Sequence, residues 1–263
     1  MNRIDATFAR LRQRNAKALI AYLTVGFPSL KSLPGLVKVL AEEGVDLIEL
    51  GIPFSDPLAD GPTIQAASQQ ALKQKVTPPT VLRAVEGLRQ DQFKHPIVVL
   101  TYYNPILQVG IKEFCRECVS HGVDGLIVPD LPPEEASELQ AAARSLQVDT
   151  IFLAAPTSPV SRLKQIARAS SGFIYYVSLT GVTGARSSVS REVASQVRRI
   201  KRLSPLPVCV GFGISGPAQV REVVQVADGA IVGSALLEVI AHAPRNPIQA
   251  AGNFIRSLRR ACQ

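Results

Sequence analysis

The chain has 263 residues, of which 46% are hydrophobic and 19% are charged, and its formal net charge at pH 7 is +8. This length is typical of a (β/α)8 barrel of about 250 residues, and the composition excludes a disordered chain. Aromatic residues make up only 5%, too few for a base-stacking surface, so the positive charge indicates solvated helix faces rather than nucleic-acid binding.

The segment 1–14 predicts a short amphipathic helix, with Ile4, Phe8 and Leu11 on one face. It lacks the apolar block and small-residue cleavage site of a signal peptide, and no apolar run in the chain reaches the roughly 20 residues that cross a bilayer. We therefore expect a cytoplasmic protein, with the plastid stroma as the alternative if the protein is plastid-encoded.

Short apolar runs alternate with longer amphipathic segments along the chain. The predicted strands are 18–24, 46–51, 96–102, 124–128, 149–154, 173–178, 207–211 and 228–232. The predicted helices are 30–43, 62–74, 78–90, 105–121, 133–146, 159–169, 190–203, 216–226 and 246–260, and another helix begins at Ser234.

Strands that alternate with helices imply parallel βαβ units with right-handed crossovers. The expected α/β fold is a single (β/α)8 TIM barrel with an extra N-terminal helix, and residues 1–263 are expected to form one domain. The alternative is a doubly wound open sheet, but the chain lacks the Gly-x-Gly-x-x-Gly turn that such a sheet often carries after its first strand.

Glu49 is a carboxylate near the end of the second predicted strand. Side chains alternate along a strand, so Ile48, Leu50 and Ile52 share one face and Glu49 lies on the other. Both faces of such a strand are expected to be covered, and an unpaired buried charge is unfavourable. A structural ion pair with a distant cation is one interpretation. Because no cation lies nearby in sequence, a catalytic acid/base is the favoured one.

Asp60 ends a proline-containing loop after this strand. Its commonest role would be a helix N-cap, but Gly61 and Pro62 follow it. Because proline favours the first helical position, Gly61 is the expected cap and Asp60 is left for a ligand. Ser55 and Asp56, in the same loop, can each be explained by a turn.

Two glycine-containing turns follow the last two predicted strands: GFGIS at 211–215, and Gly233-Ser234 at the start of a helix. Glycines let backbone N–H groups approach an anion, a helix N-terminus adds its dipole, and barrels commonly bind phosphate after strands 7 and 8. Phosphate binding is therefore favoured over two ordinary turns. The loop 180–187, with Gly181 and Gly184, is predicted to be a lid rather than only a flexible connection.

No metal site is expected. Cys115, Cys118 and His121 are spaced three residues apart, but on a helix such a series drifts around the axis, and a fourth ligand is missing. The four cysteines do not form a disulfide framework in a chain of this length.

Six segments carry a resemblance to a known family. They are ELGIPFSDPLADGP at 49–62, TYYNPI at 101–106, PDLPP at 129–133, SLTGVTGAR at 178–186, GFGIS at 211–215 and VGSA at 232–235. With them the chain closely resembles the alpha subunits of tryptophan synthase over essentially its whole length. The first segment is highly specific, whereas the glycine motifs recur in other phosphate-binding barrels.

The resemblance implies a carbon–carbon lyase of tryptophan biosynthesis, which cleaves indole-3-glycerol phosphate to indole and glyceraldehyde 3-phosphate in a retro-aldol reaction. It also implies an α2β2 heterotetramer in which indole passes to a beta subunit that makes L-tryptophan. Pyridoxal phosphate is expected only in that beta subunit, so this chain would carry no cofactor. The loop with Asp56 and Pro57, the helix start at 104–105 and the segment 132–133 would face the partner.

The resemblance also implies roles for individual residues. The carboxylate that matches Glu49 shuttles protons, and the one that matches Asp60 interacts with the indole N–H. Tyr175 matches an active-site tyrosine, and Thr183 is expected to orient Asp60 when the loops 53–61 and 179–189 close. The expected indole pocket consists of Tyr22, Leu100, Tyr102, Ile127, Leu153 and Phe212, with Tyr22 in place of a more usual phenylalanine. The expected phosphate-binding residues are Gly184, Gly213, Gly233 and Ser234.

Three alternatives stay open at the level of sequence. An isomerase of a phosphorylated sugar would explain the glycine turns, but not an apolar pocket beside Asp60. A regulatory subunit without catalytic activity would have no need to retain both Glu49 and Asp60. A stand-alone lyase that releases free indole would use identical chemistry.

Overall fold

A computed structural model describes residues 2–178, 191–211 and 213–262. The strands are β1 Ala18–Thr24, β2 Leu47–Gly51, β3 Ile97–Leu100, β4 Gly125–Ile127, β5 Asp149–Ile151, β6 Leu153–Ala154, β7 Ile174–Val177, β8 Val208–Gly211 and β9 Gly229–Val232. They form one 9-stranded sheet in the order β5-β4-β3-β2-β1-β9-β8-β7-β6. Every pairing between them is parallel.

The predicted fifth strand closes this sheet into a barrel. It is interrupted at Phe152, and its two halves pair with different neighbours, β5 with β4 and β6 with β7. The carbonyl of Phe152 accepts a hydrogen bond from the backbone N–H of Tyr175 at 3.1 Å, so the pairing with β7 continues through the interruption. The predicted (β/α)8 barrel is confirmed, and one predicted strand supplies both β5 and β6.

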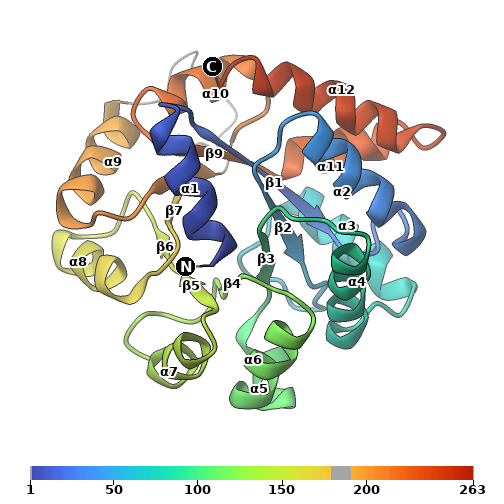
Figure 1. Cartoon of the computed structure of the whole chain (residues 1–263), viewed down its shortest axis with the longest axis horizontal. Coiled ribbons are helices and arrows are strands. Elements are labelled where there is room, and N and C mark those ends of the chain that lie inside the picture. Colours follow the sequence, from blue (N-terminus) through green and yellow to red (C-terminus); the bar gives the residue numbers. More distant parts are fainter. Residues whose placement is uncertain (1, 179–190, 212, 263) are drawn as a thin grey trace.

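The helices surround this barrel (Figure 1). They are α1 Arg3–Gln13, η1 Leu30–Ser32, α2 Leu33–Glu42, α3 Pro62–Lys73, α4 Pro78–Gln90, α5 Tyr103–Val109, α6 Ile111–Ser120, α7 Ser137–Ser145, α8 Val160–Ala169, α9 Arg191–Leu203, α10 Pro217–Val224, α11 Ser234–His242 and α12 Pro247–Arg259.

Three predicted helices differ from those observed. The predicted helix 30–43 is divided into the 3-10 helix η1 and the α-helix α2. The predicted helix 105–121 is divided into α5 and α6 at Gly110, whose φ of +91° lies outside the helical region and favours glycine. The predicted helix 133–146 begins only at Ser137, because the preceding residues form turns with i to i+3 hydrogen bonds, such as Ala136 N–H to Pro133 C=O. The pair Pro132-Pro133 favours an extended backbone at Pro132, which delays the helix.

The alternation of side chains along the strands creates two separate apolar layers. Outward residues such as Ile48 and Leu50 pack against the surrounding helices. Inward residues such as Leu47 and Ile231 fill the barrel together with residues of α1. Phe8 of α1 contacts Phe173 with ring centroids 5.8 Å apart, so α1 closes the N-terminal end of the barrel. Figure 1 shows α1 crossing that end.

Aspartates at the N-terminal ends of the strands hold the same end together. Asp124 accepts a hydrogen bond from the backbone N–H of Ile97 at 2.8 Å and forms ion pairs with Arg89 at 2.7 Å and Arg3 at 2.8 Å. The corresponding groups elsewhere are Asp46 with Leu19 N–H and Arg259, and Asp228 with Val208 N–H and Lys201. These carboxylates fix neighbouring strands relative to one another at the N-terminal end of the barrel.

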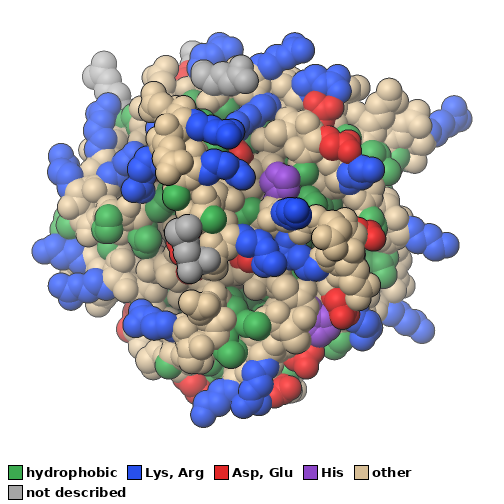
Figure 2. Space-filling view, viewed as in Figure 1, with side chains coloured by type: hydrophobic (Ala, Val, Ile, Leu, Met, Phe, Trp, Pro, Cys, Tyr) green, Lys and Arg blue, Asp and Glu red, His purple; other side chains and the backbone are tan. Residues whose placement is uncertain are grey.

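The basic residues lie largely on the outside of the barrel. Figure 2 shows lysine and arginine side chains spread over several outer helices on the face that carries α1, with acidic and uncharged side chains between them. This distribution agrees with solvated helix faces. Among the described residues, no helix is both long enough and apolar enough to span a membrane.

Candidate active site

A cavity lies at the C-terminal ends of the strands, where barrels of this type place their active sites. It has a volume of about 170 Å³. The predicted residues that line it are Tyr22, Glu49, Asp60, Leu100, Tyr175, Gly213, Gly233 and Ser234. Residues from both ends of the chain therefore meet in one cavity, as expected for a closed barrel.

Glu49 lies on the inward face of β2, as the alternation predicts. Its side chain is buried, with a residue exposure of 1%, and its Oε2 atom has no hydrogen-bond partner among the described residues. No ion pair involving Glu49 occurs in that part of the chain. Burial and, to a smaller extent, the negative charge of Asp60 raise the pKa of Glu49 to about 8. A buried carboxyl group of this kind holds its proton at neutral pH.

Asp60 is placed by the loop that follows β2. Gly61 is the N-cap of α3 and Pro62 opens the helix, so Asp60 is outside the helix as predicted. The backbone carbonyl of Asp60 accepts a hydrogen bond from Gln65 Nε2 at 2.8 Å. Burial raises the pKa of Asp60 to about 6, and a hydrogen bond from the Tyr102 hydroxyl partly offsets this increase. Asp60 is therefore ionised at pH 7, when Glu49 still holds its proton.

Tyr102 links this loop to the end of β3. Its hydroxyl accepts a hydrogen bond from the backbone N–H of Ala59 at 3.0 Å, and its ring stacks on Phe54 with centroids 5.2 Å apart. Tyr102 does not itself line the cavity, but it holds Asp60 at the edge of it. This contact explains why an aromatic residue with a hydroxyl suits the position.

Two glycines make room for two buried tyrosines. A Cβ atom on Gly51 would lie 2.1 Å from the hydroxyl oxygen of Tyr22, and one on Gly211 would lie 2.4 Å from that of Tyr175. These distances exclude any larger residue without movement of the rings. The Tyr22 hydroxyl forms a hydrogen bond with Thr24 at 3.2 Å. Both rings therefore lie against the strands that carry the site.

The opposite end of the cavity has the backbone geometry of an anion site. Gly213 has a φ of +76°, a conformation that favours glycine. Gly233 is the N-cap of α11, and Ser234 is the first residue of that helix. Free N–H groups at a helix start carry partial positive charge, so this end suits a phosphate group. Glu238, one turn further along α11, lines the same cavity.

Not every predicted residue lines the cavity. Ile127 and Leu153 lie in the apolar interior of the barrel, because β4 and β6, which carry them, contribute no residue to the lining of the cavity. Thr183, Gly184 and Phe212, together with the predicted lid 180–187, lie outside the described residues.

Six lining residues were not expected from the sequence: Ile64, Ile214, Ser215, Ile231, Ala235 and Glu238. The alternation along β9 points to Ile231, which lies two residues before Gly233 and shares its face. Ile64 and Glu238 have no such signal, because their positions depend on how the first turns of α3 and α11 lie over the barrel.

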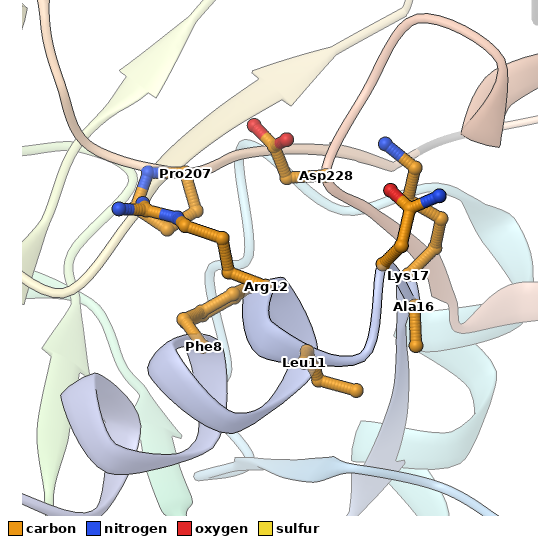
Figure 3. Close-up of a pocket in the computed structure, with 8 residues that line it drawn as sticks. Phe8, Leu11, Arg12, Ala16, Lys17, Pro207 and Asp228 are labelled. Carbon is orange, nitrogen blue, oxygen red and sulfur yellow. The ribbon is translucent and has the colours of Figure 1, made fainter.

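A second hollow of about 120 Å³ lies at the opposite end, beside α1 (Figure 3). Residues of α1, including Phe8, line one wall, and Pro207 and Asp228 line the other. The carboxylate of Asp228 is already paired with Lys201 Nζ at 2.7 Å. Because this is the only carboxylate that lines the hollow, the cavity at the C-terminal ends of the strands is the candidate active site.

Comparison with protein families gives one match over nearly the whole chain. The profile described as Tryptophan synthase alpha chain matches residues 8–262. A tryptophan synthase alpha chain from Geotalea uraniireducens (strain Rf4) is 47% identical over 260 residues, which are 98% of this chain and 97% of the relative. One from Chloroflexus aggregans (strain MD-66 / DSM 9485) is 49% identical over 259 residues, which are 98% of this chain and 97% of the relative.

Solved structures give the same result. The crystal structure of tryptophan synthase subunit alpha from Legionella pneumophila str. Paris superposes with a TM-score of 0.93 at 38% identity, covering 100% of this chain and 98% of that chain. The aminoacrylate-bound form of tryptophan synthase from M. tuberculosis superposes with a TM-score of 0.89 at 36% identity, covering 100% of both chains.

The burial of Glu49 predicts a pH dependence of stability. The pKa of Glu49 is raised from 4.5 to about 8 in the folded chain, so the folded state keeps a proton that the unfolded state releases in this range. The free energy of unfolding should therefore fall as the pH rises from about 5 to 8, by up to about 1.4 kcal/mol for each pH unit. Glu49→Gln cannot ionise and should become more stable than the wild type by several kcal/mol over the same range.

Urea unfolding of both proteins at pH 5.5, 7 and 8.5 measures this difference. Glu113→Gln is the matched control, because it makes the same chemical change at a half-exposed position on α6. A difference between Glu49→Gln and the wild type that stays constant with pH would show that Glu49 ionises normally in the folded chain.

Proposed function

The chain belongs to the family of tryptophan synthase alpha chains, lyases that cleave indole-3-glycerol phosphate to indole, and we propose that Glu49 and Asp60 carry out this cleavage in the cavity at the end of β2. The observation that carries the proposal is the pair of carboxyl groups in one cavity whose pKa values are raised to about 8 and about 6. Two such groups in different environments can act as acid and as charge partner at the same pH.

Glu49 supplies and recovers the proton. Its neutral carboxyl group donates a proton to C3 of the indole ring, which leaves a carboxylate on Glu49 and a positive charge on the ring. The carboxylate then removes the proton from the hydroxyl group next to the bond that breaks. The C–C bond electrons return to the ring, the C–O bond becomes the aldehyde of glyceraldehyde 3-phosphate, and Glu49 is neutral again. A pKa near the working pH suits both transfers.

Asp60 stabilises the charge that forms on the ring. When C3 is protonated, the positive charge is centred on the ring nitrogen, and an ionised carboxylate that accepts the N–H hydrogen bond stabilises it. The lower pKa of Asp60 fits this role, because the group must stay ionised while Glu49 is neutral. Thr183, outside the described residues, is proposed to orient Asp60 when the loops close.

The rest of the site binds the two ends of the substrate. Tyr22, Leu100 and Tyr175 hold the indole ring, and Phe212 and Ile127 are proposed to complete this apolar region. Gly213, Gly233 and Ser234 hold the phosphate, with Gly184 as a further contact. Support comes from the apolar lining at one end of the cavity and the helix start at the other. The chain 1–263 is proposed to act as one domain.

Family membership excludes the sugar-phosphate isomerase as an alternative. In this family pyridoxal phosphate belongs to the beta subunit, and the alpha chain works without it.

We propose that the chain forms an α2β2 assembly and passes indole to its partner, rather than acting as a stand-alone lyase. The matches to bacterial alpha chains favour the cytoplasm over a plastid as its location.

The proposed partner surface is at the catalytic end of the barrel. Leu58 is 91% exposed in the loop that carries Asp56 and Pro57, and Leu107 is 50% exposed on α5. Exposed aliphatic side chains on segments that follow neighbouring strands suit a contact with another protein. The bond between Ala59 and Tyr102 ties the two segments together.

The first functional prediction concerns the two carboxylates. Glu49→Gln should lower kcat for indole formation by about 10²–10⁴-fold, because the proton donor is lost while the shape is kept. Asp60→Asn should lower kcat by at least about tenfold, because a neutral group stabilises the ring cation less. Steady-state indole formation measures both. A Glu49→Gln rate within threefold of the wild type would contradict the acid/base role. It would instead favour the alternative that the chain is a regulatory subunit without catalytic activity.

The second prediction concerns the phosphate end. Ser234→Asp places a carboxylate at the first turn of α11, where it should not destabilise the helix, because negative charge is favourable at a helix N-terminus. The same charge should repel a phosphate and weaken the binding of glyceraldehyde 3-phosphate at least tenfold, or by about 1.4 kcal/mol. Ser234→Asn, of similar size without the charge, is the control. Equal dissociation constants for the two variants would place the phosphate elsewhere.

The third prediction concerns the partner. Leu58→Ser should weaken binding to a beta subunit at least fivefold, because it removes an exposed aliphatic group from the proposed contact. Titration calorimetry with the purified beta subunit measures this affinity. Val119→Ser is the control, because Val119 is 40% exposed near the C-terminal end of α6, away from the catalytic face. If both variants bind as tightly as the wild type, the partner does not use this loop.

A further inference from the structure

One hydrogen bond connects the two ends of the cavity. The hydroxyl of Thr63 donates to Glu238 Oε1 at 2.9 Å. Thr63 lies in the first turn of α3, directly after the segment that carries Asp60. Glu238 lies on α11, one turn after Ser234, and lines the cavity with it. The bond therefore joins the segment of the proposed charge partner to the helix of the proposed phosphate site.

The other hydrogen bonds of this segment point elsewhere. Among the described residues, Ala59 is held by Tyr102 at the end of β3, and Gln65 closes back onto the carbonyl of Asp60. The remaining backbone bonds stay within the loop and the first turn of α3. Of the hydrogen bonds described for residues 58–65, the one from Thr63 is the only one that reaches α11.

The charge of Glu238 is unfavourable for phosphate binding. Residues four apart on a helix lie about 5–6 Å apart at their Cβ atoms, so the carboxylate of Glu238 is close to a phosphate held at Ser234. Like charges at this distance weaken anion binding. A carboxylate, however, makes a hydrogen bond roughly twice as strong as a neutral acceptor does. The charge thus gives a stronger connection to Thr63 and a weaker phosphate site.

We propose that Glu238 is a positioning residue, which holds Thr63 and thereby fixes Asp60 at the correct distance from the phosphate site. The inference rests on the roles proposed above for Asp60 and for the start of α11. The substrate spans both ends of the cavity, so its ring nitrogen meets Asp60 only if α3 and α11 keep their spacing. Small displacements of a catalytic group lower rates strongly, because the reaction depends on its position.

This role predicts that removing the charge of Glu238 lowers kcat but strengthens the binding of phosphate. Thr63→Val and Glu238→Ala should each lower kcat three- to tenfold, and the double variant should lower it no further, because both changes remove the same bond. Thr63→Ser keeps the hydroxyl and should restore kcat. Glu238→Gln keeps an acceptor for Thr63 but removes the charge, so it should lower kcat less than Glu238→Ala does while it tightens the binding of inorganic phosphate at least twofold.

The test uses the full chain, with kcat for indole formation and the inhibition constant of inorganic phosphate as readouts. Glu113→Gln, a change of the same charge on α6, is the control for the overall field of the protein. The melting temperature should stay nearly constant, because the bond between Thr63 and Glu238 is exposed and adds little to global stability. A purely structural contact would instead lower the melting temperature and leave kcat of the folded enzyme unchanged.

The outcomes separate this inference from the proposed function. Wild-type kcat for Thr63→Val and Glu238→Ala, or losses that multiply in the double variant, would overturn the positioning role. Unchanged phosphate inhibition in Glu238→Gln would overturn the charge effect. If Asp60→Asn and Ser234→Asp still show the losses expected above, only the positioning role fails. If those two variants behave like the wild type, the proposed assignment of the site fails first.

Discussion

The site depends on one constraint, the burial of a carboxyl group inside the barrel with no ion pair to a cation among the described residues. Glu49 points from β2 into the barrel interior, and the residues packed there are mostly apolar. Burial of the charged form is unfavourable by several kcal/mol, so the group stays protonated at neutral pH. This burial would be unfavourable in an ordinary core, and it is the property on which the proposed role of Glu49 as a proton donor rests.

The burial of Glu49 lowers the stability of the fold at neutral and higher pH, so other parts of the barrel must stabilise it. The N-terminal end of the barrel supplies this stability, through the packing of α1 into the interior and through paired aspartates such as Asp124, which binds two arginines and a backbone N–H. The unfavourable burial of Glu49 is therefore offset by ion pairs and packing at the opposite end. The same separation of stability and function recurs in barrels of this type.

The barrel and the two carboxyl groups could be predicted from the sequence by local rules, whereas the apolar pocket residues Tyr22 and Leu100 were expected only from the family resemblance. Strand alternation placed Glu49 inside, and the preference of proline for the first helical turn left Asp60 outside α3. The break at Gly110 was not foreseen, since a glycine inside a helical pattern is often tolerated. Glu238 was also missed. Its place in the cavity depends on the packing of α11 beside α3, and no spacing in one sequence reports a contact between distant helices.

The two carboxyl groups differ in function because they differ in how they are held. Glu49 belongs to a strand hydrogen-bonded on both sides, so its position changes little and it suits proton transfers over a short, fixed path. Asp60 belongs to a loop, and its position depends on Tyr102 at one end and on the first turn of α3 at the other. In the proposed mechanism Asp60 pairs with an indole ring that is charged only transiently, and a loop lets its carboxylate adjust to the position of that ring. If the proposed roles of the two groups hold, a change in the loop would move Asp60 and leave the buried Glu49 in place.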